Sequence, residues 1–355
     1  MKIRALALLS TIIVLLSILG LVGAQGNPPG TPPPRPGNEQ GGGGGEQNRE
    51  PLTVDTTYQA VESTYTGIAS VTLGIGESLG DLSLTTECPT GERFVAAESG
   101  LVIADDGTEW IVPIEVNEGA GTVDMFNNCT GDGDNPDFLD ELETVVVDAD
   151  GEEITGFIFG DNYFELYIND EFIGRDTIGF VPFNSSAARF QVNYPYTVAV
   201  HLADWETHPG IGMEYDNYQV GDAGFIARFS DGTITSDDWV CKPVYIAPLD
   251  DPVCVVEDEF GNADSSACSP NPTCSTSNPD MCRALHYEID ENWSSTDFDD
   301  SNWLNASLYD ASDVTNQRGY VDYADMFGEA NFIWSSNLDL DNGVICRFTV
   351  EAPGE

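Results

Sequence analysis

Aromatic and acidic side chains are interleaved in one short polar segment, "DWETHPGIGMEYDNYQ" (204–219). Aromatic rings can stack on the C–H face of a sugar, while carboxylates and amides bind its hydroxyls. The segment joins two expected strands and is long for a plain connection, which favours function. We therefore predict a glycan-binding loop; packing of its tryptophan in the core is the alternative. The predicted ligand-binding residues are Trp205, Tyr215, Asp216 and Tyr218.

A second acidic segment, "TGDGDNPDFLDE" (130–141), has the composition of a calcium loop. Calcium takes six to eight oxygen ligands from closely spaced carboxylates and carbonyls. We predict that Asp132, Asp134 and Asp137 bind calcium, with a solvated loop as the alternative, because the full EF-hand pattern is missing. In "NLDLDN" (337–342), Asn337, Asp339 and Asp341 alternate and would share one face of a strand, which we expect to be solvent-exposed, with a cation site as the alternative.

The segment "NWSSTDFDDSNW" (292–303) places two tryptophans around three aspartates. Its residue types are compatible with a metal loop, a sugar-binding loop or an anchored surface turn.

Enzyme signals are weak. "GESLG" (76–80) matches G-x-S-x-G around Ser78, but the residues that follow alternate like a strand, whereas a nucleophile elbow leads into a helix. The three histidines, His201, His208 and His286, have no metal-ligand spacing, and His201 reads as a residue of a strand. Among so many acids a glycosidase carboxylate pair cannot be located. We therefore expect a non-catalytic protein.

Charge restricts the partners. The chain has 61 Asp and Glu against 12 Lys and Arg, a formal net charge of -49. Such a surface repels nucleic acids and anionic membranes and suits divalent cations or a salty medium. With 41% hydrophobic residues, the 355-residue chain can still build a sizeable core.

The N-terminal region indicates export. A basic start, an apolar run and a small-residue site before Gln25 predict a signal peptide over 1–24, with an uncleaved anchor as the alternative. Residues 25–52 are rich in Pro and Gly and predict a disordered tether. We expect an extracellular protein, secreted or held at the cell surface. Four N-glycosylation acceptor sequences begin at Asn128, Asn184, Asn292 and Asn305.

Eight cysteines follow the leader, an even number that favours disulfides in an oxidising compartment. Cys88 and Cys129 are isolated from the others, so we expect them to pair. The segment 254–282 is rich in Ser, Pro and Asn and predicts a loop held by disulfides. No C-x-x-C occurs, which argues against zinc.

Hydrophobic patterning predicts an all-β protein. Short runs rich in Val, Ile, Phe and Tyr alternate with turn residues, and "DADGEEI" and "FSDGTIT" carry Asp-Gly turns typical of hairpins. One short helix is expected over 137–145. We predict an antiparallel β-sandwich or jelly roll over 151–355, preceded by a smaller β-rich unit over 53–150.

Several segments resemble galactose-binding-like jelly-roll domains, and together they cover about 155–353. They are "DNYFELYINDEFIGRD", "YPYTVAVHLADWE", "GFIARFSDGTITSDDW", "WSSTDFDDSNWLNA" and "NFIWSSNLDLDNGVICRFTV". Their order is cyclically shifted from the common arrangement, and Asp170 replaces the usual Gly of the central turn. The resemblance implies a jelly roll in which Phe298 and Trp303 pack under the sandwich. It also implies that Asp299 and Asp300 cap backbone N–H groups of their turn.

The fold alone does not fix the function. We expect a non-catalytic carbohydrate-binding or adhesive module, assisted by calcium, whose partner is a glycan or another extracellular surface component. One alternative is an acidic matrix or surface-assembly protein that self-associates. The other is a secreted polysaccharide hydrolase.

Overall fold

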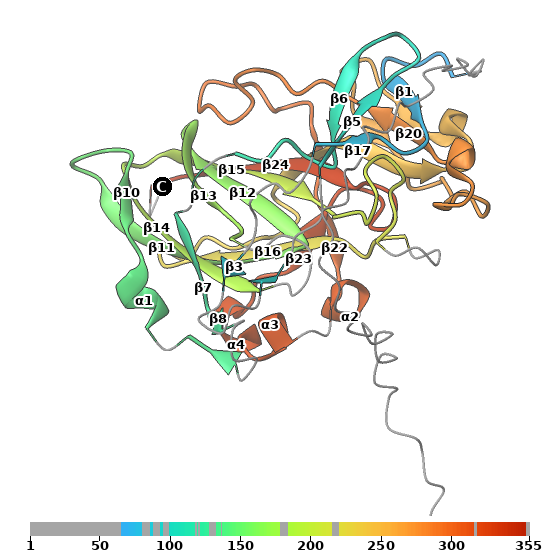
Figure 1. The fold of residues 1–355 in the computed structure, drawn as a ribbon. Coiled ribbons are helices and arrows are strands. Elements are labelled where there is room, and N and C mark those ends of the chain that lie inside the picture. Colours follow the sequence, from blue (N-terminus) through green and yellow to red (C-terminus); the bar gives the residue numbers. More distant parts are fainter. Residues whose placement is uncertain are drawn as a thin grey trace, which may run out of the picture. The chain divides into compact units, whose positions relative to one another are not determined.

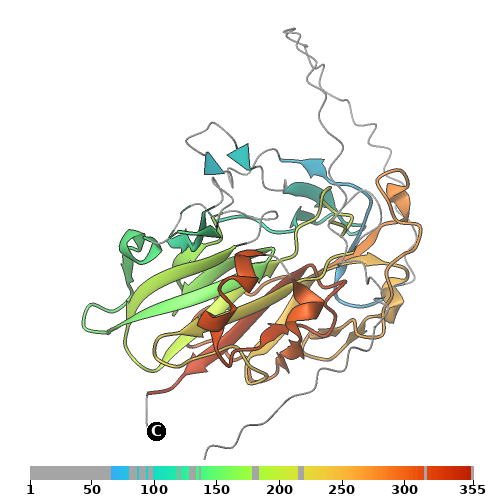
Figure 2. The ribbon, with the colours of Figure 1, turned by 90° about the horizontal axis from the view of Figure 1, so that it is seen from below.

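Two largely antiparallel β-sheets pack face to face and confirm the predicted all-β sandwich (Figures 1 and 2). The structure is a computed structural model. It describes residues 65–79, 86–87, 93–94, 99–117, 119, 121–127, 133–135, 137–177, 184–214, 220–315 and 318–352.

The first sheet has eight strands within these residues, and we call it sheet 1. Its strands are, in spatial order, β1 (Ser70–Leu73), β20 (Arg283–His286), β17 (Val240–Leu249), β24 (Gly343–Val350), β15 (Tyr196–Ala203), β12 (Tyr163–Ile168) and β13 (Glu171–Arg175), with β21 (Leu304–Asn305) also paired to β17.

The opposing layer, sheet 2, has seven strands within the described ranges. They are β10 (Thr144–Val146), β14 (Ser185–Val192), β11 (Glu152–Asp161), β16 (Gly224–Phe229), β23 (Phe332–Trp334) and β22 (Ser307–Tyr309), with β7 (Thr122–Asp124) also paired to β14.

Smaller elements cover the two sheets. The short strands are β2 (Glu77–Ser78), β5 (Gly100–Ile103) and β6 (Glu109–Val112) in one group, and the pairs β3 (Thr86–Glu87) with β4 (Arg93–Phe94), β8 (Phe126–Asn127) with β9 (Gly133–Asp134), and β18 (Val256–Glu257) with β19 (Ala263–Asp264). The helices are α1 (Phe138–Glu141), α2 (Ala311–Val314), α3 (Arg318–Val321) and α4 (Ala324–Phe327), with 3₁₀ turns η1 (Pro252–Cys254) and η2 (Pro279–Met281). No helix in the described ranges is long and apolar enough to cross a membrane.

Alternation along the strands places the core between the sheets. In β12, Phe164, Leu166 and Ile168 are fully buried in the main apolar cluster, while Glu165 and Tyr167 belong to the other face of sheet 1. Successive side chains of a strand point to opposite faces, so "YFELYI" supplies a core face and a second, mixed face.

Strands from the predicted N-terminal unit join the sandwich itself. β1 extends sheet 1 through β20, and both β7 and β10 pair with β14 in sheet 2. The described residues before 150 therefore contribute strands to both layers, and no break at residue 150 separates them from the sandwich.

The two predicted Asp-Gly hairpins differ in outcome. The turn in "FSDGTIT" returns the chain, since Phe229 N–H donates to Thr233 and Arg228 pairs with Ile234. The hairpin predicted for "DADGEEI" is wrong, because β10 and β11 both pair with β14, β10 in parallel. The predicted helix over 137–145 is shorter than expected, as α1 is four residues long.

The turn between β12 and β13 forms without the glycine usual in the resembling family. Asn169 and Asp170 both have positive φ, 52° and 73°, a backbone region that Asn and Asp tolerate better than most residues. Asn169 Oδ1 accepts from Thr197 N–H at 2.8 Å, and Asp170 Oδ1 accepts from Ser294 Oγ at 2.5 Å. These partners hold the turn in place from neighbouring segments.

Three disulfides lie in the described part of the chain. Cys241–Cys346 joins β17 to β24, and Cys254–Cys268 and Cys274–Cys282 confirm the predicted disulfide-held loop. They indicate an oxidising, extracellular-type environment. The expected Cys88–Cys129 pair lies outside the described residues.

Candidate functional site

The outward face of sheet 1 carries a cleft of about 500 Å³. Its floor comes from strands β12, β15, β17 and β20, and one wall is the segment from β6 to residue 117. Figure 1 shows β5 and β6 on the side of sheet 1 away from sheet 2. The polar and aromatic side chains of its lining include Trp110, Asn117, Glu165, Tyr167, His201 and His286.

Glu165 is the fixed polar group of the cleft floor. Its Oε1 accepts from Asn117 N–H at 2.7 Å and from Tyr163 Oη at 3.0 Å. Its Oε2 accepts from Tyr167 Oη at 2.6 Å and from Asn117 Nδ2 at 3.3 Å. Four donors occupy the carboxylate, so it orients the groups around it and has little capacity left for a ligand.

His201 is the polar group of the cleft that is open to a ligand. It lies directly across from Glu165 in the β12–β15 ladder and packs edge-on against Trp293 at 6.2 Å. None of the described residues hydrogen-bonds to its ring nitrogens. Burial lowers the pKa of His201 to about 4, although Glu165 acts in the opposite direction. The imidazole is therefore neutral at physiological pH and offers one donor and one acceptor to the cleft.

A stack of three rings forms the other part of the lining. His286 lies between Trp110, at 5.4 Å, and Tyr245, at 4.8 Å, and Thr72 Oγ1 is 2.7 Å from His286 Nε2. Burial lowers the pKa of His286 to about 3, so this ring is also neutral. Trp110 is partly exposed, although its indole nitrogen is buried and has no hydrogen-bond partner among the described residues. The exposed part of the ring is the surface that a ligand can contact.

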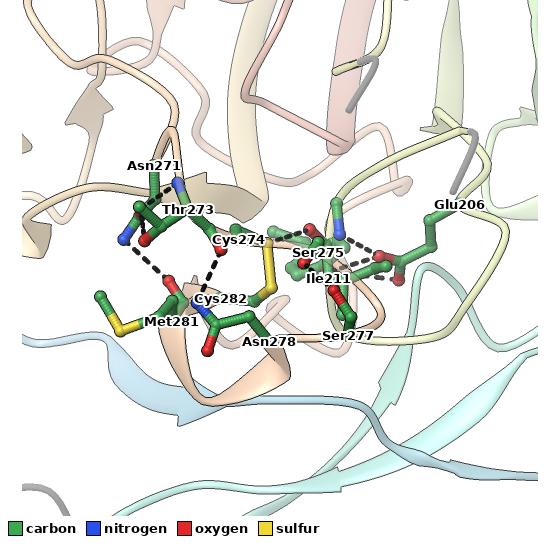
Figure 3. Close-up of a disulfide and its surroundings, with 12 residues drawn as sticks. Glu206, Ile211, Asn271, Thr273, Cys274, Ser275, Ser277, Asn278, Met281 and Cys282 are labelled. Carbon is green, nitrogen blue, oxygen red and sulfur yellow. Dashed lines mark hydrogen bonds between the residues drawn. A yellow bond between two sulfur atoms is a disulfide. The ribbon is translucent and has the colours of Figure 1, made fainter. Parts of the chain in front are cut away.

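Glu206 accepts hydrogen bonds from Tyr245 and so holds one ring of the stack in place. Tyr245 Oη donates to both carboxylate oxygens, at 3.1 and 3.0 Å, and the N–H groups of Gly210 and Gly212 donate to the same carboxylate. Burial raises the pKa of Glu206 to about 7, against the lowering effect of these donors. The same turn contacts the Cys274–Cys282 disulfide, where Cys274 Sγ lies 3.7 Å from Ile211 O (Figure 3).

The described part of the predicted glycan loop, residues 204–214, is largely buried. Trp205 is 1% exposed and packs edge-on against Tyr163 at 5.6 Å, as the core alternative requires. Glu206 and Glu214 are buried as well. The ring of Trp205 is thus not presented to solvent, contrary to the exposed platform expected from the sequence. Tyr215, Asp216 and Tyr218 lie outside the described residues, and their ligand role stays a prediction.

The predicted calcium loop is not brought together as a site in the described part. Asp137 is exposed and precedes α1, and Asp134 belongs to β9, where only its backbone is described. Asp132 lies outside the described residues. Calcium binding by these three aspartates stays a prediction.

The segment 292–303 is an anchored turn, the structural alternative. Arg347 of β24 is 1% exposed and donates to the carbonyls of Trp293, Ser295 and Phe298 and, at 2.7 Å, to Asp300 Oδ2. Trp303 and Phe298 pack edge-on at 5.6 Å, as the resemblance implied. The cap predicted for Asp299 is present, on Ser301 N–H, whereas Asp300 pairs with Arg347 through its side chain.

The sequence carries one signal for the cleft in strand β12. Tyr163, Glu165 and Tyr167 alternate with apolar residues, and a carboxylate on an otherwise apolar strand needs partners. His201 is recognisable as a strand residue, but its position opposite Glu165 depends on strand register. Trp110 and Asn117 come from a distant segment that only the folded chain brings over sheet 1.

Comparison with protein-family models, curated proteins and solved structures finds no match to this chain. The function must therefore be inferred from the cleft and from the composition of the chain.

Proposed function

We propose that the protein is a secreted or surface-tethered, non-catalytic module that binds a neutral glycan in the cleft on the outward face of sheet 1. The observation that carries this proposal is the combination of partly exposed rings, Trp110 and Tyr167, with the unengaged imidazole of His201 in one cleft. Ligand pockets commonly join apolar ring surface to a few fixed polar groups in this way.

The chemistry of the lining favours an uncharged ligand. Glu165 is held by four donors, and the two cleft histidines are neutral. The chain carries a formal net charge of -49, which repels uronic acids and sulfated sugars. A neutral sugar could place its C–H face on a ring and exchange hydroxyl hydrogen bonds with His201.

The rest of the chain fits this role. Three described disulfides suit an extracellular module, and the Pro- and Gly-rich segment 25–52 would space the sandwich from a surface. The sequon at Asn184 is a poor glycan acceptor in the folded protein, because this side chain is fully buried.

Binding to an array of neutral and anionic oligosaccharides, followed by calorimetric titration of the strongest ligand, tests the proposal. We expect His201→Ala to weaken binding by about tenfold or more, as expected when hydrogen bonds worth about 1.4 kcal/mol are lost. His208→Ala is the matched control, because His208 is outside the cleft lining. Release of reducing ends by the same preparation would instead support the hydrolase alternative.

Two results would overturn the proposal. One is a wild-type protein that binds none of the neutral glycans at millimolar concentration. The other is full binding by His201→Ala together with loss of binding by the double variant Tyr215→Ala/Tyr218→Ala, which would place the site on the sequence-predicted loop.

A further inference from the structure

Acidic side chains converge where strands of both sheets end. Asp161 is the last residue of β11 in sheet 2, and Asp204 directly follows β15 in sheet 1. Glu214 and Asp222 lie between β15 and β16. One carboxylate oxygen each from Asp161, Glu214 and Asp222 lie within 4.8 Å of one another. Burial raises the pKa of Asp204, and all three neighbouring carboxylates act in the same direction.

The cluster is largely buried within the protein. Asp161 and Asp204 are 1% exposed, Glu214 is 4% exposed, and Asp222 is partly buried. Burial, together with a neighbouring carboxylate in each case, raises the pKa of Glu214 to about 8 and the pKa of Asp222 to about 6. No ion pair joins Asp161, Asp204 or Asp222 to a basic side chain within the described residues. Acids are rarely left in this state without a compensating charge.

Unsatisfied oxygens point independently to a ligand. Asp161 Oδ2 and Asp204 Oδ1 are buried and have no hydrogen-bond partner among the described residues. Asn342, whose carbonyl accepts from Asp204 N–H at 2.8 Å, also has a buried side-chain oxygen without a partner there. Buried polar atoms normally have partners, and these three are all acceptors, the atom type that a metal ion satisfies.

A neighbouring carboxylate shows that burial alone does not create this pattern. Asp341 is also fully buried, but it accepts from Ser265 Oγ and Ser335 Oγ, both at 2.5 Å, and from Asn337 N–H at 3.3 Å. The fold therefore supplies donors to one buried aspartate and leaves oxygens of the Asp161 cluster without them.

The backbone is also shaped around the cluster. A Cβ added to Gly221 would overlap Asp204 Oδ2, so only glycine allows the backbone to approach this carboxylate so closely. On the other side, Asn162 donates from Nδ2 to Asp161 Oδ1 at 2.6 Å and accepts from Trp205 N–H at 2.9 Å. Asn162 thus fixes the orientation of one acid.

We propose that Asp161, Glu214 and Asp222, with Asp204 beside them, form a site for one divalent cation, preferentially calcium, where the end of β11 meets the connection between β15 and β16. Oxygens at 2.3–2.6 Å from calcium can be separated by up to about 5 Å, so three carboxylate oxygens that lie within 4.8 Å of one another fit a single ion. Magnesium usually keeps several of its waters, which suits a buried carboxylate cluster less well, and zinc prefers nitrogen and sulfur ligands. The site is distinct from the loop of Asp132, Asp134 and Asp137.

Calcium titration of the chelator-treated full chain tests this site. We expect calcium to raise the melting temperature and to bind more tightly than magnesium. Terbium, a calcium analogue, should give luminescence sensitised by Trp205, which directly follows Asp204. The double variant Asp161→Asn/Glu214→Gln should lose more than about 100-fold in calcium affinity, since loss of even an outer-shell partner costs 10–100-fold. In chelator it should be at least as stable as the wild type, because two crowded, desolvated carboxyl groups are replaced by neutral amides of similar shape.

Two matched variants test whether calcium acts through this cluster. Asp134→Asn/Asp137→Asn changes the sequence-predicted loop and should keep the calcium-induced stabilisation. Asp341→Asn replaces a buried carboxylate that already has its hydrogen-bond partners. It should lower the melting temperature both with and without calcium, and calcium should still raise the melting temperature by as much as in the wild type. No calcium-induced stabilisation of the wild type, unchanged affinity in Asp161→Asn/Glu214→Gln, or equal affinity for magnesium would each overturn the proposal as stated.

Discussion

Arg347 in β24 and Asp161 at the end of β11 are both ionisable and buried, but their surroundings differ. Arg347 is joined to three carbonyls and one carboxylate, all from the segment 293–300. Asp161 has one oxygen bound to Asn162 and one without a partner in the described residues, among other acids. The hydrogen bonds of Arg347 are all made within the protein, and they hold a loop against sheet 1. One oxygen of Asp161 lacks such a partner among the described residues, and on our proposal a bound cation stabilises it.

Two neighbouring residues of the cleft differ in the same way in their hydrogen bonds. Glu165 and His201 are paired across β12 and β15, yet Glu165 has four donors, whereas no described residue hydrogen-bonds to the ring nitrogens of His201. Groups whose hydrogen bonds are complete should matter mainly for folding. Groups that are left open should matter mainly for binding, which makes the comparison testable by substitution.

The largest effect is expected from Arg347→Met. This variant leaves three carbonyls without the buried guanidinium that they share, and unsatisfied buried groups cost about 1–3 kcal/mol each, whereas Asp300 is 28% exposed and contributes less. Chemical denaturation should show this loss in the free energy of unfolding, while Arg283→Met, at a less buried arginine, should change it by less than about 1 kcal/mol. A loss below about 1 kcal/mol for Arg347→Met would contradict the conclusion that groups with complete hydrogen bonds matter mainly for folding.

Asp341→Ala should have the next largest effect. The hydroxyls of Ser265 and Ser335 lose their buried acceptor, and unsatisfied buried groups cost about 1–3 kcal/mol. Asp238→Ala, on the exposed turn before β17, should stay within about 0.5 kcal/mol of the wild type. Equal losses in the two variants, measured by the same denaturation, would contradict the structural role of Asp341.

His286→Phe should change the pH dependence of stability. Burial lowers the pKa of His286 to about 3, so between about pH 3 and 6.5 the unfolded chain binds this proton more readily than the folded one. The stability that His286 contributes is therefore present above about pH 6.5 and is lost as the pH falls. The variant keeps a ring between Trp110 and Tyr245 but should lose stability less steeply on acidification, by up to about 1.4 kcal/mol per pH unit. Parallel curves from pH 7 to 4 would show that His286 does not titrate in this way.

His201→Ala should have the smallest effect on folding. No hydrogen bond of its ring to a described residue is lost, so we expect the free energy of unfolding to change by less than about 1 kcal/mol at pH 7. Thermal unfolding monitored by circular dichroism provides the measurement. A larger loss would mean that His201 is a packing residue like its neighbours and would weaken the assignment of the cleft as a ligand site.

The sequence by itself determined the sandwich and much of its local chemistry. Alternation in segments such as "YFELYI" predicted strands with one apolar face, because the period of a strand is two residues. Cysteine spacing predicted a loop held by disulfides, and Asn169 kept its place at the β12–β13 turn. These features depend on neighbours along the chain, which the sequence shows directly.

Tertiary structure alone decided which polar groups meet. The hairpin expected at Asp150-Gly151 was wrong because β14 pairs with both flanking strands, and strand pairing is set by the whole sheet. Trp205 was expected on an exposed loop, but packing against Tyr163 buries it. Asp161 and Glu214 are 53 positions apart and meet only where the two sheets end. Residue types show which side chains can bind a ligand; strand register and packing decide whether their partners come from the protein or from outside it.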